Sequence, residues 1–97
     1  MDILKWLQQW YKENCNGDWE HTYGIEIGTL DNPGWFVKID LTDTALEDLN
    51  FEKTSIKRSE NDWVYCYIEN NVYNGSGGPL NLNEIIEIFK DLSDKNN

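Results

Sequence analysis

CNGDWEHTYGIEIGTLDNPGWFVKIDL, residues 15–41, has the pattern of a complete β-hairpin preceded by a polar, aromatic segment. Apolar residues alternate with others on both sides of a turn, which places each set on one face of a sheet. These residues are Tyr23, Ile25 and Ile27 before the turn and Trp35, Val37, Ile39 and Leu41 after it. Between them, residues 32–35 (NPGW) suit a type II turn, in which Pro33 fixes one φ and Gly34 accepts a positive φ. The segment therefore predicts two antiparallel strands.

Two amphipathic helices are predicted at the ends of the chain. The first begins after Asp2, a good N-cap, and runs to about Asn14, with its apolar face formed by Ile3, Trp6, Leu7 and Trp10. The second begins after Asn81, and Glu84 three residues later gives the spacing of a capping box. Its apolar face consists of Leu82, Ile85, Ile86, Phe89 and Leu92.

Three further strands are predicted at residues 51–58, 63–69 and 72–74. The second has apolar residues on both faces, so we expect it to be central and at least partly covered on both sides. Asn70 and Asn71 suit a type I′ turn, and residues 75–79 (GSGGP) are interpreted as a flexible linker. The predicted core includes Trp10, Ile25, Ile39, Val64, Ile85 and Phe89.

The predicted fold class is α+β. We expect an antiparallel β-meander of four to five strands flanked by N-terminal and C-terminal helices, in two layers. The 97 residues are enough for one domain, spanning residues 1–97, with one modest core.

The charge is strongly acidic, with 8 basic and 18 acidic residues and a formal net charge of −10. Such a surface repels a phosphate backbone, so we expect no nucleic acid partner; the charge favours a basic protein partner or serves only solubility. No apolar run approaches the roughly 20 residues of a membrane span, and Asp2 and Lys5 interrupt the N-terminal segment where a signal peptide is apolar. Cys15 and Cys66 are too few for a disulfide framework. We therefore expect a soluble, cytoplasmic protein, without membrane attachment, that is a monomer or weak homodimer.

Asp18, Glu20 and His21 are the residues best placed for acid–base chemistry, and His21 is the only histidine. No nucleophile or second base accompanies them at a supporting spacing. Cys15 with His21 supplies only two nitrogen or sulfur ligands, whereas a structural zinc site generally has four protein ligands. We therefore predict no catalytic residue, no metal site and no cofactor. A small-molecule enzyme or sensor using Asp18, Glu20 and His21 in a pocket is the alternative.

A set of different short motifs is distributed along almost the whole chain: Trp6-Leu7, Trp10-Tyr11, Cys15, residues 17–21 (GDWEH), Tyr23-Gly24, residues 29–35 (TLDNPGW), residues 39–41 (IDL), residues 59–63 (SENDW) and residues 77–79 (GGP). Together they resemble the immunity protein 53 family of bacterial polymorphic toxin systems. The run from Gly17 to Trp35 is the most specific part. One departure is Asn16, where the family pattern has Asp, and both residues are compatible with a left-handed turn.

The resemblance implies a non-enzymatic antidote that is made beside a toxin gene and binds the cognate toxin domain. It brings no catalytic residues with it. Two stretches are the predicted partner-binding residues: the acidic connection with Asp40, Asp43, Glu47 and Asp48, and the segment with Asp18, Trp19, Glu20 and His21. Repulsion among the carboxylates favours their exposure, and an acidic surface would steer association with the basic groove of a nuclease toxin. A structural subunit of a larger complex is a third interpretation.

Overall fold

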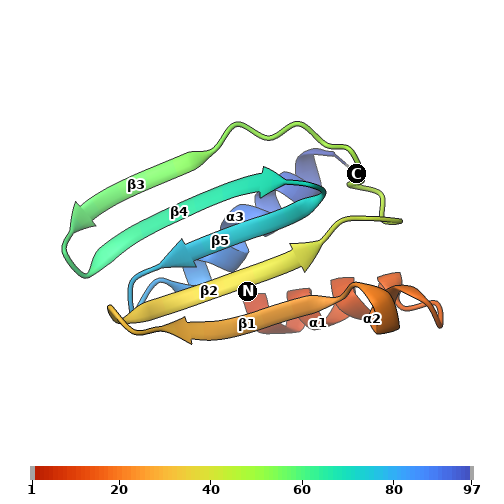
Figure 1. Cartoon of the computed structure of the whole chain (residues 1–97), viewed down its shortest axis with the longest axis horizontal. Helices are drawn as coiled ribbons and strands as arrows, with labels where there is room; N and C mark the ends of the chain where they lie inside the picture. The colour runs from red at the N-terminus through yellow and green to blue at the C-terminus, as the bar shows by residue number, and fades with distance from the viewer. Residues whose placement is uncertain (1, 97) are drawn as a thin grey trace.

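The computed structural model describes residues 2–96 as a five-stranded antiparallel sheet with helices packed against it (Figure 1). The elements are α1 (Ile3–Asn14), α2 (Trp19–Thr22), β1 (Ile25–Leu30), β2 (Gly34–Asp40), β3 (Thr54–Ser59), β4 (Asp62–Glu69), β5 (Val72–Gly77) and α3 (Leu82–Lys95). The predicted α+β class with flanking terminal helices is confirmed. The strand order is β1-β2-β5-β4-β3, so the sheet is not a simple meander: β5 lies between β2 and β4, and β3 forms an edge.

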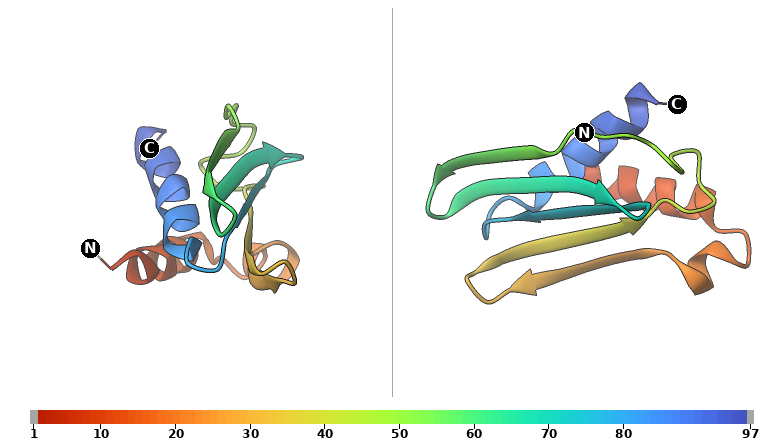
Figure 2. Two further views of the ribbon diagram at one scale, coloured as in Figure 1. Left: turned by 90° about the vertical axis from the view of Figure 1, so that its left-hand side faces the viewer. Right: turned by 45° about the horizontal axis from the view of Figure 1, so that its top comes forward.

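The two long helices lie on the same face of the sheet, as the side view in Figure 2 shows. α3 packs on β5, β4 and β2, and α1 packs on α3. The opposite face, which is turned toward the viewer in Figure 1, is covered by no helix of the described residues. We call this surface the open face. No helix within residues 2–96 has the length and apolar character needed to cross a bilayer.

The predicted linker at residues 75–79 is wrong for residues 75–77, which form the end of the central strand β5, whereas Gly78 and Pro79 do lie in the connection to α3. Gly75 and Gly77 are buried beneath α3. A Cβ atom at Gly75 would collide with the side chain of Ile85, and one at Gly77 would lie 3.1 Å from Ile85 Cδ1. Tyr73, at the other end of the strand, donates a 2.8 Å hydrogen bond from its hydroxyl to the Ile85 carbonyl. Glycine therefore allows α3 to approach the middle of the sheet closely.

Phe89 of α3 lies at the centre of an aromatic cluster. Its ring centroid is 5.0 Å from those of Trp10 and Tyr73 and 5.9 Å from that of Trp6. Five of the six predicted core residues are buried: Trp10, Ile39, Val64, Ile85 and Phe89. Ile25 is only half-buried, because β1 is an edge strand.

The turn between β1 and β2 is not the predicted type II turn. Asn32-Pro33 is a cis peptide bond, and Gly34 belongs to β2, paired with Leu30, without a positive φ. The connection therefore consists of residues 31–33. Gly34 is required for another reason: a Cβ atom there would collide with the backbone carbonyl of Gly77 on the neighbouring strand.

The predicted helix start at Asp2 and the predicted type I′ turn are confirmed. The Asp2 carboxylate accepts hydrogen bonds from the amides of Leu4 (3.1 Å) and Lys5 (3.2 Å). Asn70 and Asn71 have φ values of 53° and 61°, as a type I′ turn requires. Asn81 does occupy the N-cap of α3, but its side chain forms no capping hydrogen bond, so the capping box is absent.

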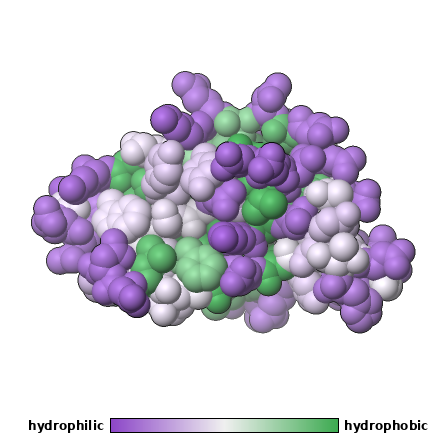
Figure 3. Space-filling model, in the orientation of Figure 1, coloured by the Kyte–Doolittle hydropathy of each residue, from purple (hydrophilic) through white to green (hydrophobic). Residues whose placement is uncertain are grey.

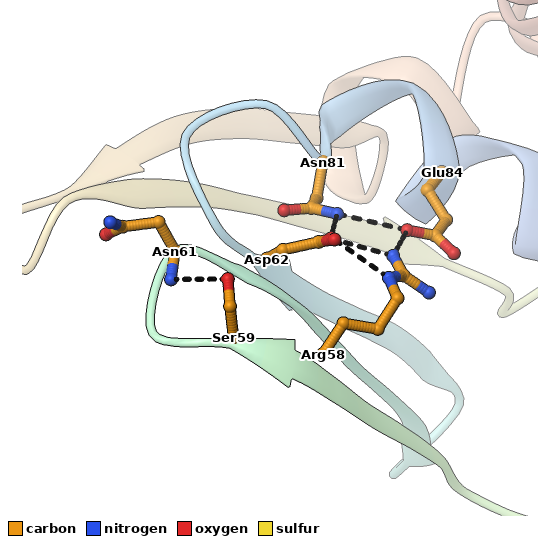
Figure 4. Close-up of polar contacts among 6 residues, drawn as sticks. All are labelled: Arg58, Ser59, Asn61, Asp62, Asn81 and Glu84. Carbon is orange, nitrogen blue, oxygen red and sulfur yellow. Dashed lines mark hydrogen bonds and ion pairs between the residues drawn. The ribbon is translucent and has the colours of Figure 1, made fainter.

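Asn81 instead joins a polar network where the β3–β4 turn meets the start of α3, shown in Figure 4. Its amide nitrogen donates to Asp62 Oδ1 (2.9 Å) and to Glu84 Oε1 (3.0 Å). Arg58 donates to both Asp62 oxygens and, at 2.5 Å, to Glu84. The Arg58 guanidinium lowers the pKa of both carboxyl groups. The network ties the β3–β4 hairpin to the first turn of α3.

Phe89→Ala should lower the free energy of unfolding by about 3–5 kcal/mol, because it removes buried apolar area and leaves a cavity. Leu80→Ala is the control, since Leu80 is 93% exposed just before α3 and its truncation should cost less than about 0.5 kcal/mol. Urea denaturation measures both. An unchanged midpoint for Phe89→Ala would show that α3 is not docked as described.

Gly34→Val should strongly destabilise the fold, because its Cβ would overlap the Gly77 carbonyl and push β2 and β5 apart. Thr29→Val is the matched control, since it places the same side chain at a position that is already β-branched and exposed on β1. A thermal melt compares the two. Equal melting temperatures would contradict the close approach of Gly34 to Gly77.

Arg58→Met should destabilise the protein at neutral pH but not in acid. A carboxyl pKa that is lowered on folding gives stability that is present above the unfolded pKa and lost as pH falls through the folded pKa. The deficit of the variant should therefore begin to shrink as pH falls to the ordinary carboxyl range of about 4, and it should vanish only below the lowered pKa values of Asp62 and Glu84. Lys57→Met, which removes a more exposed cation 4.0 Å from Glu60, is the control. A pH-independent deficit in urea denaturation would refute the role of the ion pairs.

Candidate partner-binding surface

The structure brings the two predicted partner-binding stretches to the same end of the sheet. β2 and β4 end there, β1 and β5 begin there, and α2 lies beside them (Figure 1). We call this region the acidic end and define it by its six predicted carboxylates: Asp18, Glu20, Asp40, Asp43, Glu47 and Asp48. Two stretches that are separate in the sequence therefore contribute to one end of the molecule.

The connection between β2 and β3 has a defined conformation. Leu41 and Leu46 are buried at 0% and 2% exposure and anchor it to the core. Asp43 and Asp48 have positive φ values of 64° and 61°, which Asp tolerates better than most residues. The Glu47 carboxylate accepts a 2.9 Å hydrogen bond from the Asp43 amide. As predicted, Asp43, Glu47 and Asp48 are exposed, whereas Asp40 is half-buried at the end of β2.

Hydrogen bonds tie this connection to neighbouring elements. The Asp48 amide donates to Asn71 Oδ1 (2.7 Å), and Asn71 Nδ2 donates back to the Asp48 carboxylate (3.2 Å). The Leu41 amide donates to the Asn71 carbonyl (2.7 Å), and the Asp40 amide donates to the Gly24 carbonyl (3.1 Å). The β4–β5 turn and the residues before β1 therefore hold the acidic connection in place.

The short helix α2 presents Asp18 and His21 to solvent, while Glu20 is partly engaged with the turn before it. Glu20 accepts hydrogen bonds from the amides of Asn16 (2.9 Å) and Gly17 (2.8 Å). Hydrogen bonds from its own amide, from Asn16 and from Gly17 lower the pKa of the Glu20 carboxyl. The group therefore carries its charge at neutral pH while fixing the local backbone.

Trp19 is buried and does not contribute its side chain to this surface, so its partner-binding role stays a prediction that the described structure does not favour. Its side chain is 1% exposed, with ring centroids of Trp10 and Tyr11 each 5.8 Å from its own. It joins α2 to α1 through its contacts with Trp10 and Tyr11. The tryptophan therefore belongs to the hydrophobic core.

The arrangement does not favour the enzyme or sensor alternative. The Glu20 carboxylate turns back toward Asn16 and Gly17, whereas Asp18 and His21 are exposed, so the three side chains do not converge in a pocket. Cys15 donates from its thiol to the Tyr11 carbonyl at 3.2 Å. Within residues 2–96, no group of three or more histidine, cysteine or acidic side chains is arranged to hold a metal ion.

A hollow of about 220 Å³ lies where the acidic end meets the open face. Tyr23, Glu26, Lys38, Asp40 and Val72 contribute to its lining. Tyr23 is 39% exposed here. The acidic end therefore continues onto the sheet as a shallow surface with both apolar and charged groups.

The open face was not predicted as a candidate surface. The apolar residues on both sides of residues 63–69 instead predicted that both sides are at least partly covered. Val64 and Cys66 are indeed buried under α3, and burial raises the pKa of the Cys66 thiol. Tyr65 is 36% exposed on the other side, which the described residues leave uncovered. The same aromatic signal therefore marks a surface rather than a second core.

Comparison with known proteins gives one clear result. A search of curated proteins and a search of solved structures each found no match to this chain. The family model for immunity protein 53 matches residues 4–94, which include every strand, α2 and nearly all of α1 and α3. The match agrees with the motifs quoted above from the sequence. Because it spans nearly the whole chain, the protein belongs to the immunity protein 53 family.

Proposed function

We propose that this protein is an antitoxin that binds and neutralises the toxin domain encoded beside it in a polymorphic toxin system. Family membership, which suggests an antitoxin role, is the observation that carries the proposal. The protein acts by forming a complex and not by catalysis. It acts as one copy per toxin domain in the cytoplasm, where a toxin made in the same cell must be neutralised.

The acidic end supports a charge-based encounter with the toxin. Asp43, Glu47 and Asp48 project from one connection whose backbone is held by Leu41, Leu46 and Asn71. Carboxylates on a preorganised loop lose little conformational freedom on binding. In a chain of net charge −10, they attract a cationic surface and raise the association rate.

A nuclease is the toxin class that this surface fits best. The substrate groove of a nuclease must attract phosphate, so it is basic, and carboxylates that enter it would take the place of the phosphates. Neutralisation would then follow from occupying the groove. A toxin that acts on a neutral or cationic substrate would have no reason to present a basic groove to this end.

The first test measures association with the C-terminal domain of the toxin encoded immediately upstream. Asp43→Asn, Glu47→Gln and Asp48→Asn should together slow association severalfold at low salt and flatten its salt dependence, with little change in the dissociation rate. Asparagine is chosen because positions 43 and 48 have positive φ, which asparagine tolerates. Stopped-flow mixing at two salt concentrations gives the rates.

The matched control neutralises three exposed carboxylates on the helical layer, by Glu13→Gln, Glu87→Gln and Asp91→Asn. It changes the net charge equally, so any difference between the two variants reports position and not total charge. Equal association rates and salt slopes for both variants would contradict docking at the acidic end. Failure of the wild-type chain to bind the toxin domain would overturn the proposed function itself.

A further inference from the structure

We propose that the toxin domain docks on the open face of the sheet and places cationic side chains on the aromatic rings there, an inference that rests on the proposed function. An antiparallel sheet with one solvated face ordinarily carries polar residues on that face. Here the open face carries Phe36, Trp63, Tyr65 and Tyr67. Figure 3 shows patches of pale and hydrophobic surface on this face, with hydrophilic side chains between them and around the edge.

The strand register orders these residues in cross-strand rows. Phe36 and Tyr65 both pair with Ser76 of β5, so one row places two aromatic residues on either side of a small one. In the next row, Lys38 and Tyr67 both pair with Asn74. The small residues of the central strand thus form the floor of a trough between taller side chains on β2 and β4. A hollow of about 110 Å³ lies along it.

The third row joins the trough to the acidic end. Asp40 and Glu69 both pair with Val72, so two carboxylates stand on either side of one apolar residue. Glu26 lies beside them, opposite Lys38 on β2. Moving along β4, a ligand therefore meets Tyr65, then Tyr67, then Glu69. The face changes from aromatic to acidic over two rows.

This spatial order of aromatic rings followed by carboxylates suits the binding of cationic side chains. Arginine and lysine bind the faces of aromatic rings, and arginine also forms paired hydrogen bonds with a carboxylate. The face already holds one such contact, because Lys38 Nζ lies 5.9 Å from the Phe36 ring centroid. The rings of Tyr65 and Tyr67 have centroids 5.3 Å apart, which makes a continuous aromatic platform.

A basic protein surface fits this face better than other occupants do. A second copy of this chain would bring its own net charge of −10, with Glu26, Asp40 and Glu69, against the same groups. Nucleic acid phosphates would meet those carboxylates as well, and the lysines near this face, Lys38, Lys53 and Lys57, do not outnumber them. The molecule extends 40 × 27 Å across this view, enough for the roughly 800 Å² that each partner contributes to a standard interface.

The test compares two tyrosines of the open face, Tyr65 and Tyr67, with Tyr11 on the helical layer. Tyr65 is 36% exposed on the open face, and Tyr11 is 38% exposed on α1. With the upstream toxin domain as the probe, Tyr65→Ala and Tyr67→Ala together should weaken binding at least about tenfold, mainly through faster dissociation, because buried tyrosines are frequent hot spots. Tyr11→Ala should leave the affinity within about twofold of the wild type. Biolayer interferometry measures the affinities, and thermal melts confirm that each variant is folded.

Hydroxyl-radical footprinting tests the location with the unmodified chain. The toxin domain should protect Tyr65 and Tyr67 from oxidation and leave Tyr11 unchanged. Wild-type binding without protection of Tyr65 and Tyr67, and with undiminished affinity of the double variant, would overturn this inference while leaving the antitoxin role intact. Absence of wild-type binding would overturn both. Protection of the same tyrosines in the free chain as its concentration rises would show a self-association face and would also overturn the inference.

Discussion

The close packing of α3 on the glycine-containing strand β5 is the constraint on which the rest of the structure depends. Because Gly75 and Gly77 have no side chains on the helix-facing side, Ile85 packs directly on the backbone of the central strand. The Tyr73 hydroxyl reaches up to the Ile85 carbonyl and fixes the position of the helix along the strand. Phe89, one helical turn after Ile85 in α3, packs against both Trp10 of α1 and Tyr73 of β5, and the three rings form one aromatic cluster.

This one-sided core leaves the other side of the sheet available for a partner. The aromatic side chains there do not belong to the folding core, and the carboxylates of the acidic end repel one another. Both features are costly for an isolated chain and useful for one that forms a complex. The acidic end would bring a basic toxin domain to the molecule, and the open face would hold it. On this proposal, long-range attraction and short-range aromatic contact would have separate places on one surface.

Local chemistry predicted the parts of the fold that depend on neighbours in sequence. Asp2 caps α1 through short-range hydrogen bonds, and Asn70-Asn71 forms the predicted type I′ turn because asparagine tolerates positive φ. The glycines of β5 were misread because glycine usually interrupts strands, and their reason for being there, the close approach of α3, is not local. The same holds for Gly34, whose partner is the Gly77 carbonyl on another strand.

The candidate surface was predictable only in part, for the same reason. Repulsion among neighbouring carboxylates predicted the exposure of Asp43, Glu47 and Asp48. Trp19 lies between charged residues in the sequence, but its ring turns inward against Trp10, a contact that spacing alone does not reveal. The joining of α2, the acidic connection and the open face at one end depends on the strand order, which places β5 between β2 and β4.

The most direct measurement of the central claim is an NMR titration of the isotope-labelled chain with the unlabelled upstream toxin domain. Backbone amide shifts map the contacted surface residue by residue. The account predicts the largest changes in β4, β5 and the connection from Leu41 to Leu49, with little change in the exposed residues of α1. Changes concentrated on the outer sides of α1 and α3, with the open face unaffected, would contradict it.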